Sequence, residues 1–522
     1  MSWKEEVAGI EQRRETAALH GGSEAVERQH AAGRLTIRER IATLVDPRSF
    51  RELGGIAGHS QRREDGGPSA FVPANYVLGF GKLGGRSVVI GGEDFTQRGG
   101  SPSPAGLRKS VYAEELACRY RMPLVRLLEG GGGSVPRGRG ERAAGSPAPS
   151  GDSASAAPRF MSIMQALGSV PVASAALGAV AGLPAARLVG SHFAVMVAEH
   201  SQVLVGGPAL VERALGRSPG KEELGGARVH LRSGVVDNAA SDELGALGLI
   251  REFLSYLPGN VWERAPLQAC ADDPERNEEE LLSIVPRDRR KPYKMRRILG
   301  LVLDEGRFFE LAPQFGASQI TGFGRLAGQP VGVLANDPYY YAGAMTADGA
   351  IKVRRFVDTC DTFHLPIVSF VDEPGFMIGP DAERAATIRH GVATLCAIMQ
   401  STVPWASVIV RKVYGVAGGA HFGPGGLRLA WPSAESGALP VEGGVAVAYR
   451  RELQAAEDPE ALRREIEDRM LAQRSPYTAA EAFAVHDLLD PRATRPALTQ
   501  WIEHIQPQLE HQLGPRAYTL RP

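Results

Sequence analysis

Two kinds of hydrophobic periodicity follow each other along the chain. The first 45 residues are polar with a helical spacing, and segment 36–39 has the pattern of a capping box ahead of an apolar stripe. From about residue 75, short apolar runs such as 87–90 and 124–128 alternate with helical stretches such as 105–120. This alternation is typical of an α/β fold around a sheet. After about residue 450 the pattern predicts charged helices.

The β-α pattern occurs twice. GFGKLGGRSVVIGGED begins at Gly79, and GFGRLAGQPVGVLAND begins at Gly322, 243 residues later. The same offset relates Glu129 to Asp372, and 13 of the 54 positions over 79–132 are identical without a gap. Two unrelated segments that share turn glycines would explain less of this identity than an internal duplication does.

A second match relates residues 180–182 to residues 416–418, at an offset of 236. We therefore expect two copies of one α/β domain, spanning 1–270 and 271–522, with helical extensions at both ends. The charged, proline-bearing stretch 265–292 is the candidate linker. The Gly/Ser/Ala/Pro run at 137–158 is expected to form a mobile surface loop or lid.

Composition narrows the class of protein. The 522 residues carry 59 Lys and Arg against 59 Asp and Glu, which removes the electrostatic case for a nucleic-acid or anionic-membrane binder. Ordinary hydrophobic content rules out a disordered or fibrous chain. Four scattered cysteines without a CxxC pair, no apolar signal core at the N-terminus and no apolar stretch of spanning length favour a cytoplasmic protein. Glycine is in excess, with 62 residues.

The glycines gather in clusters at duplicated positions. Clusters 130–133 and 372–376 follow a predicted strand, whereas clusters 178–183 and 415–421 precede a probable helix. A turn into a helix leaves backbone N–H groups unpaired, and such groups can stabilise an oxyanion. Tight turns and close helix–sheet contacts are the alternative for any single cluster. Four clusters at duplicated positions favour paired oxyanion sites.

Conventional catalytic side chains are scarce. The chain has no G-x-S-x-G, HExxH or Walker A pattern. His421 is the best acid/base candidate, with a packing role as the alternative. Glu129 and Asp372 either cap backbone N–H groups or bind a ligand. The pair 411–412 and the basic run 287–297 either meet phosphates or form solvated surfaces.

The chain resembles the carboxyltransferase (β) subunit of biotin-dependent acyl-CoA carboxylases, the propionyl-CoA and methylcrotonyl-CoA carboxylase family. The resemblance covers nearly the whole chain. The segments that show the resemblance include AAGRLTIRERIATLVDPRSF, GFGKLGGRSVVIGGEDFTQRGGS, KEELGGARVHLRSGVVD, REFLSYLPGN, GFGRLAGQPVGVLAN, VDEPGFMIG, AWPSAE and SPYTAAEAFAVHDLLDPRATRPAL.

The resemblance implies two crotonase-like domains, with acyl-CoA on the N-terminal domain and biotin on the C-terminal domain of a neighbouring subunit in a dimer-based hexamer. It implies that the N–H pair Gly182–Leu183 stabilises the enolate of the acyl thioester. The pair Gly419–Ala420 would hold the ureido oxygen of biotin. CO2 would pass from carboxybiotin to the α-carbon of a short acyl-CoA such as propionyl-CoA.

Several positions depart from the family pattern. The family's S-G-G-A-R-I-Q-E-G reads G-G-G-G-S-V-P-R-G at 130–138, within which Gly131 and Gly132 are the expected substrate contacts. The family's G-G-A-Y is matched to 418–421, which makes His421 and the following Phe422 further candidates for the acyl pocket.

The chain shows neither a biotinylation tetrapeptide nor an ATP-binding carboxylase domain. A separate biotin carboxylase and biotin carrier subunit are therefore the expected partners. A biotin-dependent decarboxylase or transcarboxylase subunit and a non-catalytic acyl-CoA-binding scaffold remain the alternatives.

Overall fold

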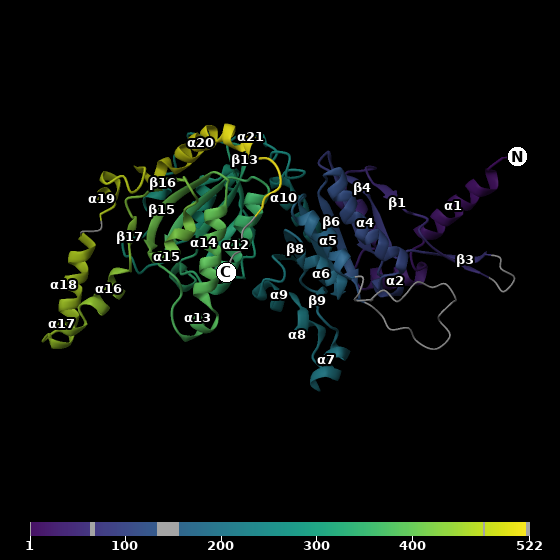
Figure 1. The fold of residues 1–522 in the computed structure, drawn as a ribbon, viewed down its shortest axis with the longest axis horizontal. Coiled ribbons are helices and arrows are strands. Elements are labelled where there is room, and N and C mark those ends of the chain that lie inside the picture. The colour runs from purple at the N-terminus through teal and green to yellow at the C-terminus, as the bar shows by residue number, and fades with distance from the viewer. Residues whose placement is uncertain (1, 63–67, 133–155, 473–474, 518–522) are drawn as a thin grey trace. The chain divides into compact units, whose positions relative to one another are not determined.

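The computed structural model describes residues 2–62, 68–132, 156–472 and 475–517 (Figure 1). The chain divides into two compact units, Met1–Glu263 and Arg264–Pro522. The division falls a few residues before the predicted one at 270, so the candidate linker belongs to the second unit. Most of the predicted surface loop at 137–158 lies outside the described residues.

The first unit is built on one mixed sheet with the strand order β1-β4-β5-β6-β7-β8-β10, in which β9 also pairs with β7. The first pairs are antiparallel, and from β5 onward neighbouring strands are parallel. The strands are β1 (Arg51–Leu53), β4 (Tyr76–Leu83), β5 (Arg86–Glu93), β6 (Leu124–Gly130), β7 (Val172–Ala181), β8 (Phe193–Val197), β9 (Gln202–Leu204) and β10 (Asn238–Ala240), with a separate hairpin of β2 (Gly58–Arg62) and β3 (Pro68–Pro73).

The second unit repeats this order as β11-β12-β13-β14-β15-β16-β18, and β17 pairs with β15 as β9 pairs with β7. The predicted duplication is therefore confirmed at the level of topology. The strands are β11 (Phe309–Leu311), β12 (Gln319–Leu326), β13 (Gln329–Asn336), β14 (Ile367–Glu373), β15 (Trp405–Tyr414), β16 (Leu427–Ala430), β17 (Glu435–Gly437) and β18 (Asp487–Leu488).

Helices cover both sheets (Figure 1). In the first unit they are α1 (Lys4–Ala18), α2 (Ser23–Ala31), α3 (Ile37–Leu44), α4 (Pro104–Tyr120), α5 (Ala156–Leu167), α6 (Leu183–Val189), α7 (Pro208–Leu215), α8 (Lys221–Gly225), α9 (Ala227–Ser233) and α10 (Glu243–Tyr256). In the second they are α11 (Met295–Val302), α12 (Ala347–Thr362), α13 (Pro380–Arg384), α14 (Thr387–Gln400), α15 (Gly415–Gly418), α16 (Val441–Ala448), α17 (Arg450–Ala455), α18 (Pro459–Ala472), α19 (Pro476–Glu481), α20 (Thr494–His504) and α21 (Gln506–His511).

Local sequence signals account for several of these boundaries. Helix α3 begins at the predicted capping box, in which Thr36 accepts from the backbone of Glu39 and the Glu39 side chain returns to the backbone of Thr36. Strands β6 and β14 are buried along their whole length, as expected for the centre of a parallel sheet covered on both faces. The helices predicted before residue 45 and after residue 450 are present.

The duplicated GFG motif has a packing explanation. A Cβ atom on Gly79 would lie 2.4 Å from the carbonyl oxygen of Arg51, and one on Gly322 would lie 2.3 Å from that of Phe309. In both units the glycine lets the long hairpin, β4–β5 or β12–β13, pack closely against the short edge strand, β1 or β11. None of the helices in the described part of the chain is long and apolar enough to span a membrane.

Candidate functional site

The pairing of the middle strand with its neighbour is irregular at the same place in each sheet. The parallel register of β6 with β7 shifts between Leu128 and Gly130, and that of β14 with β15 shifts between Val371 and Glu373. The residues inside the two irregularities are Glu129 and Asp372, and both are fully buried. At this point one residue of β6 or β14 faces three residues of β7 (177–179) or β15 (410–412), so the extra residues are on the neighbouring strand. The acid lies outside the regular pairing, so its backbone and its charge both need other partners.

The backbone N–H of each of these two acids has the same kind of partner in both units. Asp372 donates its N–H to Asn336 Oδ1 at 2.9 Å. The N–H of Glu129 donates to the carboxyl group of Glu93. Asn336 is the last residue of β13 and Glu93 is the last residue of β5, and the repeat offset of 243 relates the two positions. The same backbone N–H is therefore accepted by an amide in one unit and by a carboxyl group in the other.

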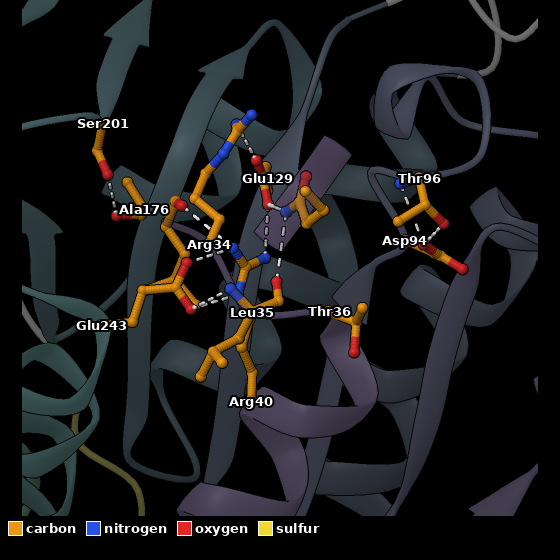
Figure 2. A network of polar contacts seen from close by, with 12 residues as sticks. Arg34, Leu35, Thr36, Arg40, Asp94, Thr96, Glu129, Ala176, Ser201 and Glu243 are labelled. Carbon is orange, nitrogen blue, oxygen red and sulfur yellow. Dashed lines mark hydrogen bonds and ion pairs between the residues drawn. The ribbon is translucent and has the colours of Figure 1, made fainter. Parts of the chain in front are cut away.

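The charge of Glu129 is balanced by residues far away in the sequence (Figure 2). Arg40 places its NH1 2.7 Å from Glu129 Oε2, Gln29 Nε2 donates to the same oxygen at 2.8 Å, and Arg34 pairs with the other oxygen. Arg40 also donates from Nε to Glu243 Oε2 at 2.9 Å. This network ties the N-terminal helices and α10 to the end of β6.

In the second unit, the charge of Asp372 is balanced by a different set of residues. Arg411 NH2 and the Tyr293 hydroxyl both donate to Asp372 Oδ2 at 3.0 Å, and the N–H of Lys412 donates to Oδ1 at 3.1 Å. The Arg411 guanidinium also lies 4.7 Å from the centre of the Tyr293 ring. Burial, assisted by the Asp372 charge, holds the Tyr293 pKa well above its usual value, so the hydroxyl stays a donor.

These contacts decide between the two roles expected for the acids. Asp372 does accept a backbone N–H, and both acids are neutralised by buried arginines. They therefore act inside the fold, as anchors for the chain segments beside them. Their arginine partners were not expected from the sequence.

Glu93 is a buried acid that was not predicted from the sequence. It is 4% exposed, and burial raises its pKa to about 7 against the opposing charge of Arg187. Its Oε2 atom has no hydrogen-bond partner among the described residues. The equivalent Asn336 uses its Nδ2 group to donate to Gly343 O at 3.1 Å and to Glu373 Oε2 at 3.0 Å. A protonated Glu93 has such a donor, and an ionised one has none.

The first glycine turn lies at the end of β7. Gly182 has φ 64° and precedes α6, whose first residue is Leu183. A Cβ atom on Gly182 would lie 2.8 Å from the Cα of Gly132, and the N–H of Gly131 donates to Gly99 O at 3.3 Å. The structure thus brings all four predicted residues of the first unit together. The N–H groups of the first helical turn have no acceptor within the helix.

The strand register corrects the alignment of the second turn. Ala179–Ala181 pair with β9 as Lys412–Tyr414 pair with β17, which gives an offset of 233. The offset of 236 taken from the repeated Val-Ala-Gly letters is wrong for these strands. The structural equivalent of Gly182 is Gly415, which also has a positive φ, 61°. The short sequence match fell three residues later by coincidence of small residues.

The pair Gly419–Ala420 lies at the far end of this turn. Gly419 is helical (φ −62°), and its N–H is directed at the carbonyl oxygens of Val416 and Ala417. Ala420 is fully buried. The N–H groups of Gly415 and Val416 lie at the start of α15, where first-turn N–H groups have no acceptor within the helix.

His421 and Phe422 are directed into the fold. The His421 side chain is fully buried, with Nδ1 2.9 Å from Ser369 Oγ and Nε2 3.6 Å from Glu373 Oε2. Phe422 is half-buried, and the Arg428 guanidinium lies 5.3 Å from its ring centre. These positions fit the packing role of His421 better than an acid/base role.

Comparison with known proteins places this architecture in a family. A family model described as "Carboxyl transferase domain" matches residues 28–512. The chain therefore belongs to the carboxyl transferase domain family. Its two units are the two crotonase-like domains that the resemblance implied.

Individual relatives are similar over nearly the full length. The chain is 36% identical over 502 residues to the propionyl-CoA carboxylase carboxyltransferase subunit of Haloferax mediterranei, which covers 95% of each chain. It is 34% identical over 495 residues to the mitochondrial propionyl-CoA carboxylase β chain of Homo sapiens, covering 93% of this chain and 88% of the other.

Solved structures of carboxyl-transferring proteins are similar to the chain over nearly its whole length. The crystal structure of transcarboxylase 12S, a hexamer assembly with methylmalonyl-CoA and methylmalonic acid bound, superposes with a TM-score of 0.87 at 30% identity. That match covers 100% of this chain and 99% of the other. A single-chain long-chain acyl-CoA carboxylase matches with a TM-score of 0.80 at 29% identity, covering 96% of this chain and 50% of that one.

We expect Arg40→Met to destabilise the first unit. The substitution leaves Glu129 and Glu243 buried without their shared cation, which costs about 3–5 kcal/mol when one partner of a buried pair is removed. Thermal unfolding measures the effect. Arg28→Met is the control, because it removes a surface pair with Glu24 that is 67% and 85% exposed. Equal midpoints for the two variants would contradict the anchoring role.

We expect Glu93→Gln to stabilise the protein at alkaline pH. From about pH 4.5 to 7, folded Glu93 holds a proton that the unfolded chain has lost, so its contribution to stability falls as pH rises through this window. Glutamine keeps the acceptor and adds a donor. The variant should gain up to about 3 kcal/mol near pH 8, less than about 1 kcal/mol near pH 5, and nothing near pH 3.

Thermal midpoints measured across that pH range test this expectation. Glu115→Gln, on the exposed side of α4, is the control. Parallel pH profiles for the wild type and Glu93→Gln would show that Glu93 is ionised at all these pH values.

Proposed function

We propose that this chain is the carboxyltransferase subunit of a biotin-dependent acyl-CoA carboxylase, which moves CO2 from carboxybiotin to the α-carbon of a short acyl-CoA such as propionyl-CoA. The observation that carries the proposal is the match of the carboxyl transferase family over residues 28–512, with both glycine turns inside it. Biotin supplies the activated carboxyl group when it is bound, and the chain supplies the binding and electrostatics.

The first unit is proposed to hold the acyl thioester. When the α-carbon loses its proton, negative charge gathers on the thioester oxygen, and N–H groups of Gly182 and Leu183 are placed to stabilise it. Gly182 is exposed and has no Cβ atom, so a carbonyl group can approach this turn closely. Preorganised N–H donors of this kind contribute about 3–4 kcal/mol each to a developing oxyanion.

The second unit is proposed to hold the biotin ring. Its ureido oxygen is a neutral acceptor, which calls for N–H donors and not for a counter-charge. The turn at Gly415–Val416 offers such donors at the position equivalent to Gly182–Leu183. We therefore favour this pair over Gly419–Ala420, whose first N–H group is already used within the turn.

We further propose that the chain works in the cytoplasm with a separate biotin carboxylase and biotin carrier subunit, and assembles as a dimer-based hexamer. The four cysteines, which are all free thiols, are compatible with a reducing compartment. The hexameric transcarboxylase 12S, at a TM-score of 0.87, supports this assembly.

The same similarity to transcarboxylase 12S supports a second candidate, in which the chain moves a carboxyl group away from an acyl-CoA. The two candidates share one site and differ in direction. Partner subunits and the identity of the acyl-CoA would distinguish them.

We expect the purified chain to convert methylmalonyl-CoA to propionyl-CoA in the presence of free biotin. The reaction runs the proposed transfer backwards and needs no partner subunit. Chromatography of the acyl-CoA products measures it, with a reaction lacking biotin as the control. The absence of biotin-dependent turnover of both methylmalonyl-CoA and malonyl-CoA would contradict a catalytic role and leave the binding scaffold.

Substitutions of Val416 test which of the two pairs, Gly415–Val416 or Gly419–Ala420, supplies the N–H donors to biotin. Val416→Pro removes one N–H group, at a first-turn position where proline preserves the helix, whereas Val416→Ala keeps that N–H and trims only a side chain that is 60% exposed. We expect Val416→Pro to lower kcat by about 100-fold or more. Val416→Ala and Gly419→Ala should retain most of the activity.

Thermal unfolding of each variant serves as the folding control. Full activity in Val416→Pro together with a large loss in Gly419→Ala would assign the donors to Gly419–Ala420 instead.

A further inference from the structure

A basic cavity lies at the carboxyl end of the second sheet. Its volume is about 320 Å³, and it is bordered by the loops that follow β13 and β14, by the end of β15 and by the segment before α11. Four of its lining side chains are cationic: Arg289, Arg290, Arg411 and Lys412. Ligands of parallel α/β sheets bind outside the carboxyl ends of the strands, which is where this cavity lies.

The cations in the cavity outnumber their counter-charges. Arg289 donates from Nε to Glu435 Oε1 at 2.6 Å, and Arg411 pairs with Asp372 at 3.0 Å. Within the described part of the chain, neither the Lys412 ammonium nor the Arg290 guanidinium lies within ion-pairing distance of a carboxylate. The four cations of the cavity therefore share two carboxylates, Asp372 and Glu435, which leaves an excess of two positive charges.

Lys412 carries the stronger signal of the two. Its side chain is half-buried, and burial is the largest influence on its pKa, which lies below the usual value. A partly desolvated ammonium group without an ion-pair partner is costly, and a bound anion would remove that cost. The backbone of Lys412 is fixed by its N–H bond to Asp372, so the ammonium group extends from a rigid strand.

We propose that this cavity binds a phosphate monoester, with Lys412 and Arg290 as its principal contacts. A phosphate monoester carries about −1.5 to −2 charges at pH 7, which matches the excess of two positive charges, whereas a carboxylate carries only one. The ureido group of biotin is neutral and the carboxylate of carboxybiotin carries one negative charge, so the proposed cofactor leaves at least one of these positive charges unmatched. Lysine and arginine are the side chains that suit phosphate oxygens best.

Two sources could supply this group. The 3′-phosphate of coenzyme A is a monoester, and in this case the proposal rests on the proposed function. A free phosphorylated metabolite or inorganic phosphate is the other source, and in this case the site is independent of it.

Titration calorimetry at low ionic strength tests the site with adenosine 3′,5′-bisphosphate, CoA, 3′-dephospho-CoA and inorganic phosphate. We expect Lys412→Met and Arg290→Met each to weaken binding of the bisphosphate by about tenfold, and added salt to weaken it further. Lys294→Met is the matched control, because this exposed lysine of the same basic segment lies outside the cavity and should leave affinity unchanged.

The ligands distinguish the sources. Tighter binding of CoA than of 3′-dephospho-CoA, with the difference lost in Lys412→Met, assigns the site to the 3′-phosphate of CoA. Equal binding of both CoA forms, with Lys412-dependent binding of inorganic phosphate, assigns it to a free phosphate. No phosphate binding, or binding that survives both cavity substitutions, overturns the proposal. Turnover of methylmalonyl-CoA is measured separately, so failure of the site and failure of the proposed function give different results.

Discussion

The fold of both units depends on one constraint, the need to satisfy a buried acid at the irregular pairing of the middle strand with its neighbour. Glu129 and Asp372 lie outside the regular pairing, where the register of β6 with β7 and of β14 with β15 shifts. An unpaired carboxylate at that depth would cost several kcal/mol, so each acid requires a buried arginine. Arg40 meets the requirement in the first unit, and Arg411 meets it in the second.

This requirement also positions the functional turns. The strand next to each acid, β7 or β15, runs directly into a glycine with positive φ, Gly182 or Gly415. A Cβ atom on Gly178 of β7 would lie 2.4 Å from Glu129 Oε1, so the strand packs against the acid itself. Because the acid, its arginine and the strand are packed in one place, the turn that follows has little freedom. Backbone donors can act on an oxyanion only when they are held in this way.

Much of the architecture could be predicted from the sequence, because repeats and capping signals are local. The GFG repeat predicted two copies of one domain, and the capping box at Thr36 predicted the start of α3. The partners of Glu129 could not be predicted, since Arg40 and Glu243 are far from it in sequence and meet only in the folded sheet. The equivalence of Gly182 with Gly415, and not with Gly418, could not be predicted for a different reason. It follows from the register of the strands before the two turns, and not from the identity of the residues in them.

The central claim is that backbone N–H groups of two equivalent turns, and not side chains, perform the carboxyl transfer. A crystal structure of the chain with bound propionyl-CoA tests it most directly. We predict that the thioester oxygen lies within hydrogen-bond distance, about 2.7–3.2 Å, of the backbone nitrogen of Leu183. A thioester bound at the second unit, or one whose oxygen contacts only side chains, would contradict it.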